Sequence, residues 1–192
     1  MADWGAFRIG PPTPRETRHD FVRATRDDTA AAADLYRRIR AHLAANIDYP
    51  RWVDEGRPAP DTVAAWIVAG ELFIAFDGEQ CVGVVALNHA APQGYADAAW
   101  AVEAEPEEVL LIHALGVDPE RPRQGIARFL VDGALAVARE MGCRAVRLDT
   151  YVDNAPAREL YARHGFTNLG LHTLDYGVAD LTQFHLFEYV LD

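Results

Sequence analysis

The sequence predicts a single α/β domain with a mixed sheet that is covered by helices on both faces. Its 192 residues suit one domain with a sizeable core. Hydrophobic residues make up 50% of the chain and charged residues 24%, a balance that is typical of globular proteins. Segments with helical spacing of apolar residues alternate with short β-rich runs, and no repeat or domain-scale linker interrupts them.

Residues 1–19 contain three prolines among polar residues, and we expect them to form an extended or mobile leader before a domain at 20–192. The run Phe21–Arg26 alternates apolar and basic side chains, as a strand does. A helix is expected from Asp28 or Thr29, either of which can cap it, to about Asn46. A second helix opens at Pro60 and ends at Gly70.

The rest of the domain begins with a hairpin, because two β-rich runs flank the turn dipeptide Asp77-Gly78. A long connection, His89–Pro106, leads to a buried strand, a turn and a helix that ends near Met141. The remaining expected elements are a strand at Ala145–Thr150, a short helix from Asn154 to His164, and strands at Phe166–Leu174 and Phe184–Leu191.

The composition excludes several classes of function. A formal net charge of -11 should repel nucleic acid and anionic membranes. All 18 basic residues are arginine, so no lysine nucleophile or Schiff base is available. Cys81 and Cys143 form neither a metal pattern nor a disulfide framework, so we expect no metal and a reduced, cytoplasmic setting. No apolar run approaches the roughly 20 residues that span a bilayer.

The most informative stretch is Leu110–Leu130, which predicts a buried strand, a tight turn and the start of a helix. The turn contains several backbone N–H donors and three arginines. Backbone N–H groups at a helix N-terminus bind phosphate, and the helix dipole favours negative charge there. The turn has neither the glycine pattern of a dinucleotide-binding fold nor that of a nucleotide-triphosphate loop. These residues therefore predict a different kind of phosphate site.

A second motif follows one strand–helix unit later and consists of Asn154, Leu160, Tyr161, Gly165 and Phe166. The corresponding positions of the first motif are Val117, Pro119, Gly125 and Ala127. Together the two motifs resemble the GNAT superfamily of N-acetyltransferases, which use acetyl-CoA. The resemblance covers nearly the whole chain. It implies a mostly antiparallel sheet of about seven strands, with a splay between its two central strands.

The resemblance also implies where acetyl-CoA binds. Backbone groups of Leu115 and Val117 would pair with the pantetheine arm at the splay. The pyrophosphate would lie on the amides of Arg123, Gln124, Gly125, Ile126, Ala127 and Arg128. Asn154 would contact CoA, and Arg158 would steady it unless it is a solvated helix arginine. The chain departs from the family at Pro122, which has no N–H to donate, so that Arg121 or Arg123 would supply the positive side chain.

Catalytic roles follow from the same resemblance. Tyr161 would protonate the departing thiolate, although a helical aromatic residue taken alone is more often part of the core. The attacking amine must lose a proton, and His113 is the only titratable side chain in the strand from Leu110 to Val117. It is either this general base or a hydrogen-bonded core histidine. Glu108 is the alternative base, unless it belongs to a solvated acidic run.

The loop after the first helix would form part of the acceptor pocket, with Tyr49 and Trp52 as substrate-binding candidates or as residues that close the core. We therefore expect an acetyl-CoA-dependent N-acetyltransferase that acts on a small amine. The alternatives are a protein or peptide N-acetyltransferase and a non-catalytic sensor of acyl-CoA. Both a monomer and a homodimer remain open.

Overall fold

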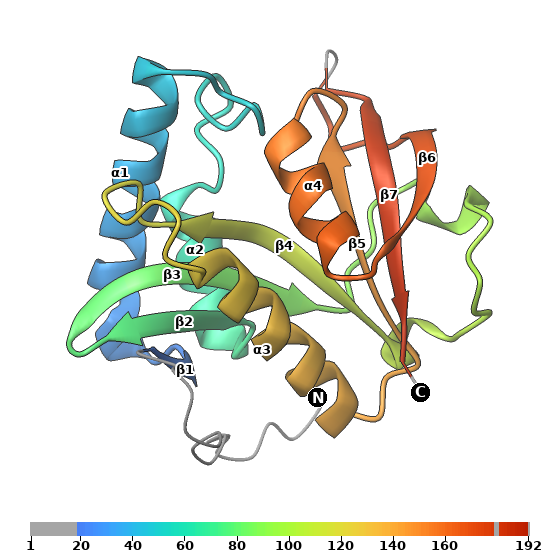
Figure 1. The fold of residues 1–192 in the computed structure, drawn as a ribbon, viewed down its shortest axis with the longest axis horizontal. Helices are drawn as coiled ribbons and strands as arrows, with labels where there is room; N and C mark the ends of the chain where they lie inside the picture. Colours follow the sequence, from blue (N-terminus) through green and yellow to red (C-terminus); the bar gives the residue numbers. More distant parts are fainter. Residues whose placement is uncertain (1–18, 179–180, 192) are drawn as a thin grey trace.

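The computed structural model describes residues 19–178 and 181–191, so the expected leader lies outside the described residues except for His19. The described chain folds into a sheet with helices on both sides (Figure 1). The helices are α1 (Thr29–Ala45), α2 (Pro60–Ala69), α3 (Ile126–Glu140) and α4 (Ala155–Arg163). The strands are β1 (Asp20–Arg23), β2 (Leu72–Asp77), β3 (Gln80–Asn88), β4 (Val109–Val117), β5 (Ala145–Tyr151), β6 (Thr167–Thr173) and β7 (Gln183–Val190).

The sheet has seven strands in the order β1-β2-β3-β4-β5-β7-β6. Only β4 and β5 run parallel, and every other neighbouring pair is antiparallel. The predicted mixed, mostly antiparallel sheet is therefore confirmed. Among the described residues, no helix is both long and apolar enough to cross a membrane.

The first strand is shorter than expected, because Arg26–Asp28 form a turn of 3-10 helix rather than extended chain. The carboxylate of Asp28 accepts hydrogen bonds from both the backbone N–H and the hydroxyl of Thr25, each of 2.8 Å. This local capping arrangement ends β1 at Arg23 and leads directly into α1.

Two core layers lie on opposite faces of the sheet. Side chains that alternate along a strand point to opposite faces, so Ala75 packs with α3 while its neighbour Ile74 packs with α1 and α2. Tyr161 of α4 belongs to the α3 layer. A third cluster, around Tyr95, Leu174 and Phe184, fills the end of the sheet beneath the long β3–β4 connection.

The central strands β4 and β5 pair over a short distance only, from Val109↔Ala145 to Leu111↔Arg147. Beyond Leu111 the two strands diverge, as Figure 1 shows. The other edge of β4 stays paired with β3 as far as Val117↔Gly83, with a register shift between Val84 and Ala86. From Ile112 to Val117, no described strand pairs with the β5-facing edge of β4, which is the predicted splay.

Candidate active site

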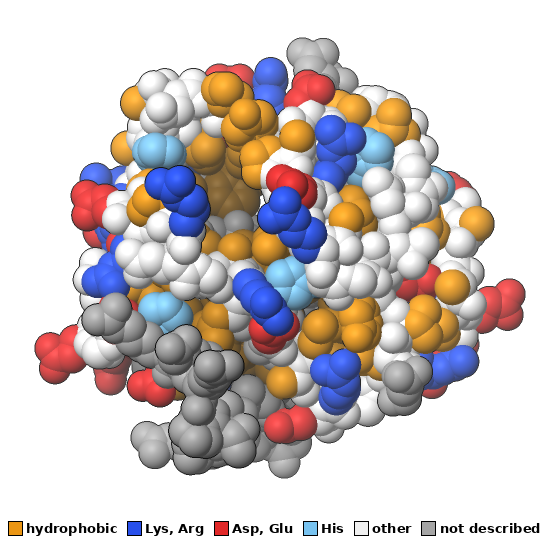
Figure 2. Space-filling model, viewed as in Figure 1, with side chains coloured by type: hydrophobic (Ala, Val, Ile, Leu, Met, Phe, Trp, Pro, Cys, Tyr) orange, Lys and Arg blue, Asp and Glu red, His pale blue; other side chains and the backbone are white. Residues whose placement is uncertain are grey.

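A pocket of about 1490 Å³ opens where β4 and β5 diverge. Its walls come from the α1–α2 loop, β4, α3, β5, α4 and the β6–β7 loop. Figure 2 shows a hollow whose interior is hydrophobic and whose rim carries basic side chains. Those that line the pocket are Arg57, Arg128, Arg139 and Arg163.

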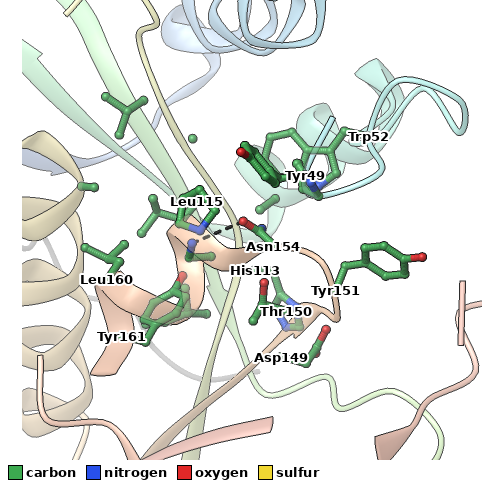
Figure 3. A pocket seen from close by; sticks show the side chains of 18 of the residues that line it. Tyr49, Trp52, His113, Leu115, Asp149, Thr150, Tyr151, Asn154, Leu160 and Tyr161 are labelled. Carbon is green, nitrogen blue, oxygen red and sulfur yellow. Dashed lines mark hydrogen bonds between the residues drawn. The ribbon is translucent and has the colours of Figure 1, made fainter. Parts of the chain in front are cut away.

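The sheet divides this pocket into two sides. Ile112 and Leu148 pack in the α3 layer, so their neighbours His113 and Asp149 point to the face that carries α1 and α2. Tyr161 reaches the pocket from the α4 side. Figure 3 shows these side chains meeting around the gap between the two strands. We call the α3–α4 side the cofactor side and the α1–α2 side the acceptor side.

The turn before α3 leaves several backbone N–H groups without acceptors. Gly125 occupies the N-cap of α3 with a φ of 79°, in the left-handed region that favours glycine. The first helical hydrogen bond runs from the amide of Phe129 to the carbonyl of Gly125, at 2.9 Å. Within residues 19–178 and 181–191, the amides of 123–128 donate to no backbone carbonyl, an arrangement that at a helix N-terminus suits an anion.

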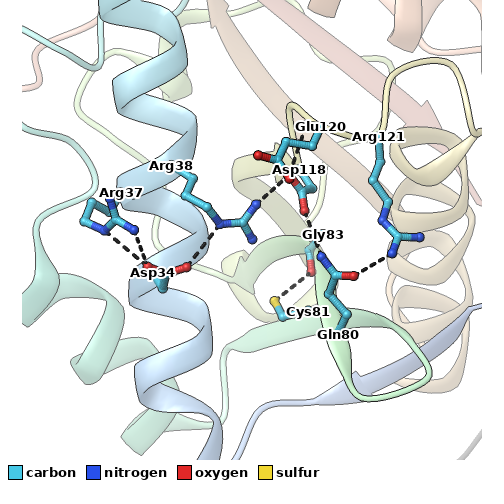
Figure 4. Close-up of polar contacts among 9 residues, drawn as sticks. All are labelled: Asp34, Arg37, Arg38, Gln80, Cys81, Gly83, Asp118, Glu120 and Arg121. Carbon is cyan, nitrogen blue, oxygen red and sulfur yellow. Dashed lines mark hydrogen bonds and ion pairs between the residues drawn. The ribbon is translucent and has the colours of Figure 1, made fainter.

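The side chains of this turn have different positions. Ile126 is buried beneath α3, whereas Ala127 and Arg128 line the pocket. Arg123, Gln124 and Gly125 are exposed. The turn itself is fixed from below by the buried carboxylate of Asp118, which accepts hydrogen bonds from Arg38 at 2.6 Å and from the amide of Glu120 at 3.1 Å (Figure 4).

The two arginines considered as partners of a cofactor phosphate differ in availability. The guanidinium of Arg121 forms an ion pair with Asp77 and also donates to the side chain of Gln80. Arg123 makes no ion pair within the described part of the chain and is exposed beside the free amides. Of the two, Arg123 is therefore the side chain that can reach an anion.

Tyr161 is 6% exposed and lies against the rings of Phe166 and Phe187, with centroids 5.5 and 5.9 Å away. Burial raises the pKa of Tyr161, and the nearby charge of Asp149 raises it further. The hydroxyl is therefore protonated at neutral pH. A buried phenol at the pocket wall can donate a proton or a hydrogen bond there, and it is also part of the core.

His113 has a defined hydrogen-bonding partner. Its Nε2 lies 2.9 Å from Oδ1 of Asn88, an oxygen that also accepts from the amide of Ala90. The amide nitrogen of Asn88 donates to Glu71, which fixes the orientation of the Asn88 side chain. His113 Nε2 must therefore carry the proton, which leaves Nδ1 with the lone pair. Burial lowers the pKa of His113 to about 4, so the ring is neutral at pH 7.

The second motif is only partly directed at the pocket. Asn154 lines the pocket, and its Oδ1 caps α4 by accepting from the amide of Ala157 at 3.3 Å. Arg158 turns away toward β7, where its Nη1 lies 3.1 Å from Nε2 of His185. Arg158 is not among the residues that line the pocket, so the structure does not bring its side chain to the proposed CoA site.

The predicted acceptor residues do line the pocket. The carboxylate of Asp48 accepts from the amides of Trp52 and Val53, which orders the α1–α2 loop. Trp52 packs edge-on against Tyr36, with ring centroids 6.0 Å apart, and Tyr49 lies nearby in the same loop (Figure 3). Trp52 therefore both packs against the core and lines the pocket.

Glu108 lies away from the pocket, at the start of β4. Its carboxylate accepts from the amide of Glu105 and approaches Arg144 to 3.6 Å. Glu108 does not line the pocket, and its position fits a solvated carboxylate that caps the preceding turn. We therefore no longer consider it as the general base.

A further carboxylate on the acceptor side, which the sequence motifs do not include, is the half-buried Asp149. Oδ2 of Asp149 accepts hydrogen bonds from the hydroxyls of Tyr95, at 2.8 Å, and Tyr176, at 2.7 Å. Burial raises the pKa of Asp149, while the two phenol donors lower it. The signal in the sequence was a charged residue between Leu148 and Thr150 in a strand that is otherwise mostly apolar.

Comparison with known proteins supports the fold and the family. A model of the "Acetyltransferase (GNAT) family" matches residues 41–166. A mycothiol acetyltransferase from Geodermatophilus obscurus is 31% identical over 157 residues, which are 80% of this chain and 46% of that protein. A mycothiol acetyltransferase from Beutenbergia cavernae is 43% identical over 67 residues, 35% of this chain and 22% of that protein. The chain thus spans less than half the length of either relative.

Solved structures show the same fold at low sequence identity. A GNAT-family acetyltransferase from Streptococcus agalactiae has a TM-score of 0.76 at 15% identity, covering 91% of this chain and 96% of that one. An acetyltransferase from Salmonella typhimurium with its cofactor acetyl-CoA has a TM-score of 0.65 at 18% identity, covering 91% and 94%. With the splayed sheet and the family match over most of the chain, these findings show that the protein belongs to the GNAT family of acetyltransferases.

Proposed function

We propose that this protein is an N-acetyltransferase that moves an acetyl group from acetyl-CoA to the amine of a small molecule. The observation that carries the proposal is the position of two side chains at the splay. Tyr161 enters one pocket from the cofactor side, and His113 enters it from the acceptor side. A proton donor and a proton acceptor on opposite sides of a gap suit a reaction in which an amine attacks a carbonyl group and a thiolate leaves.

Acetyl-CoA fits the residues that are present. The free amides of 123–128 and the exposed Arg123 suit its pyrophosphate. The unpaired edge of β4, which includes Leu115 and Val117, suits an extended arm that carries amides of its own. Thr150 offers a further sign, because its Oγ1 is buried at the pocket wall with no hydrogen-bonding partner among the described residues. Asn154 lines the same side.

The chemistry that acetyl-CoA supplies is a thioester carbonyl open to direct attack by an amine. Tyr161 would hold the proton that the leaving thiolate takes, since its raised pKa keeps the hydroxyl protonated. Nδ1 of His113 would accept a proton from the amine, directly or through a water. The depressed pKa keeps His113 neutral over the whole physiological range, so its lone pair is available, although it is a weaker base than a solvated histidine.

A small acceptor is favoured over a protein by two observations. The acceptor side of the pocket is bounded by Tyr49 and Trp52 of the α1–α2 loop and by Tyr176 of the β6–β7 loop. Three curated relatives carry the name mycothiol acetyltransferase, which refers to a small molecule. Because this chain covers less than half of each, that name suggests only the size of the acceptor.

The test is release of free thiol from acetyl-CoA in the presence of a panel of small primary amines and of peptides with free N-termini. Turnover with small amines supports the proposal. Turnover with the peptides alone would make the protein a peptide or protein N-acetyltransferase. Saturable binding of CoA with no thiol release across the panel would indicate a non-catalytic sensor.

A further inference from the structure

Asp149 is a half-buried carboxylate in the pocket wall that lacks a cationic partner among the described residues. It points to the acceptor side, near Tyr151 (Figure 3), and Tyr176 lines the same pocket. The two most deeply buried carboxylates of the described chain are paired, Asp118 with Arg38 at 2.6 Å and Glu188 with Arg147 at 3.0 Å. Among the described residues no arginine or histidine lies within ion-pair distance of Asp149.

The two arginines that act on the tyrosines around Asp149 have partners of their own. Arg57 donates to the carbonyl of Tyr176 and lies over the face of that ring, 5.9 Å from its centroid. Arg147 pairs with Glu188 and stacks on Trp100 at 4.2 Å. Neither guanidinium neutralises Asp149. On the protein side, the hydrogen bonds to the Asp149 carboxylate therefore come from neutral donors, and burial raises its pKa, so that a cation at this site would stabilise the charged form.

Those donors hold one carboxylate oxygen and leave the other available. Both Tyr95 and Tyr176 donate to Oδ2, whereas Oδ1 receives no hydrogen bond from the described residues. Tyr95 is fixed in turn, because it is 4% exposed and packs against Trp100. The two phenols thus orient the carboxylate while one of its oxygens remains free to meet a ligand.

The surroundings of Asp149 suit an organic cation. Aromatic side chains on the acceptor side include Tyr151, Tyr176 and Phe184, which pack against one another. Aromatic faces attract ammonium groups, and the attraction is strongest where water is excluded. The overall charge of -11 also favours the approach of a cation. An anionic acceptor would be repelled by the Asp149 carboxylate, and a neutral acceptor would leave it without a counter-ion.

We propose that Asp149 is the counter-ion of a cationic acceptor, and that the acceptors of this protein are small molecules that bind as organic ammonium ions. The identification of the bound cation as the acceptor rests on the proposed acetyl transfer. The existence of a cation-binding site at Asp149 is independent of that transfer. Asp149, oriented by Tyr95 and Tyr176, is then a substrate-binding residue that sets specificity. The hydrogen bond from Tyr176 connects the β6–β7 loop to Asp149.

The test compares two probes of the same shape with the protein of residues 1–192. Choline carries a quaternary ammonium group, and 3,3-dimethylbutan-1-ol replaces that nitrogen by carbon. Neither can be acetylated on nitrogen, so binding, followed by protein NMR, is measured apart from turnover. We expect choline to bind about tenfold more tightly than the alcohol, because only choline carries a charge that the carboxylate and the aromatic rings can attract. Equal affinities would overturn the proposal.

Variants assign the preference to Asp149. In Asp149→Asn the amide oxygen can still accept hydrogen bonds from both tyrosines, so the shape of the side chain is kept while its charge is lost. The ratio of the affinities for choline and for the alcohol should therefore fall to about one. Glu55→Gln is the matched control, because Glu55 lines the same pocket from the α1–α2 loop, and it should leave the ratio unchanged. A ratio that survives Asp149→Asn, or that is lost in Glu55→Gln, contradicts the assignment.

A second variant covers the case in which Asp149→Asn does not fold. Tyr176→Phe removes one donor from Oδ2 and keeps the ring, so it should weaken the binding of choline several-fold and leave the binding of the alcohol unchanged. Equal effects on the two probes would mean that Asp149 only holds the loop in place. If choline is preferred but no amine in the panel releases thiol, the cation site stands and the proposed transfer fails.

Discussion

The hydroxyl of Tyr36 on α1 donates a hydrogen bond of 2.7 Å to the carbonyl of Ala114 on β4. Ala114 has a φ of 48°, a left-handed conformation that is uncommon for alanine, and it lies directly after His113. The hydrogen bond therefore holds β4 in an irregular conformation where the strand leaves β5. Gly116 follows in close contact with α1, since a Cβ there would lie 2.7 Å from Cδ1 of Ile39. Helix α1 thus shapes the strand that presents the candidate base.

Removal of this hydroxyl should loosen the splay. In Tyr36→Phe the carbonyl of Ala114 loses its partner beside a fully buried ring, which should lower the free energy of unfolding by about 1–3 kcal/mol. Urea unfolding followed by circular dichroism measures the loss. Tyr151→Phe serves as the control, because no hydrogen bond of its hydroxyl occurs in the described chain, and it should be close to neutral. A stable Tyr36→Phe would mean that water replaces the phenol at Ala114.

The turn before α3, which we propose binds the pyrophosphate, depends on a second long-range contact, between Arg38 and the buried Asp118. Arg38→Met removes the only ion-pair partner of Asp118 within the described residues and leaves that charge buried (Figure 4). We expect a loss of about 2–3 kcal/mol of stability, below the range for fully buried pairs because the Arg38 side chain is 25% exposed. Affinity for CoA, measured by calorimetry, should fall as the turn loosens.

The neighbouring arginine provides the control for that variant. Arg37 pairs with Asp34, as Arg38 also does, but the Arg37–Asp34 pair is exposed and does not reach Asp118. Arg37→Met should therefore change stability by no more than about 0.5 kcal/mol and leave the affinity for CoA unchanged. Equal effects of the two substitutions would show that charge on α1, rather than the buried pair, supports the turn.

The elements and the turn before α3 could be predicted because their signals are local. The left-handed Gly125 precedes α3 directly, and the apolar spacing of α3 lies within the helix itself. The contacts that shape the site are not local. Tyr36 is 78 residues from Ala114, and Tyr95 is 54 residues from Asp149. Nothing in the sequence near Asp149 reveals which side chains will satisfy it, so its burial could not be foreseen.

Arg158 and Arg121 illustrate the same limit. A helical arginine near a phosphate-binding motif is a reasonable candidate for an anion, yet Arg158 is directed at His185 on β7, 27 residues away. Arg121 meets Asp77 across 44 residues. Which charge an arginine pairs with depends on the packing of strands that are distant in sequence. Motif spacing therefore indicates the kind of site more reliably than the partner of each charged side chain.

The depressed pKa of His113 predicts a pH dependence of stability. Its folded value of about 4 lies below the usual value of about 6.5, so between these values the unfolded chain binds more protons than the folded one. Stability should then fall as the pH drops from about 6.5 to 4, by up to about 3 kcal/mol from this residue. Urea unfolding of the wild type and of His113→Gln at several pH values measures this contribution.

His113→Gln is informative because glutamine can still donate to Asn88 without taking up a proton. The difference in stability between the two proteins should vary with pH between 4 and 6.5 and be constant above pH 7. A difference that is constant over the whole range would mean that His113 is more solvated than its position suggests. If the variant keeps full turnover, His113 is a core histidine and the base is a water.

The same pKa shapes the rate profile of the proposed reaction. Because His113 stays unprotonated down to about pH 4, it cannot produce a loss of kcat/KM between pH 6 and 8. Any acidic limb in that range should instead follow the pKa of the acceptor, since only the neutral amine attacks. Two acceptors whose ammonium groups differ by about two pKa units should therefore give acidic limbs displaced by a similar amount. Identical limbs for the two would indicate that a group of the protein titrates there.

Tyr161→Phe tests the role of the acid at the cofactor side. The ring should keep its contacts with Phe166 and Phe187, while the proton that the leaving thiolate needs is lost. We expect kcat to fall about 100-fold, with the affinity for CoA and the thermal midpoint nearly unchanged. Tyr189→Phe is the matched control, because Tyr189 also lines the pocket and packs against Phe166, and it should keep kcat. Retained turnover in Tyr161→Phe would assign the buried phenol to the core alone, and the thiolate would then leave with a proton from solvent.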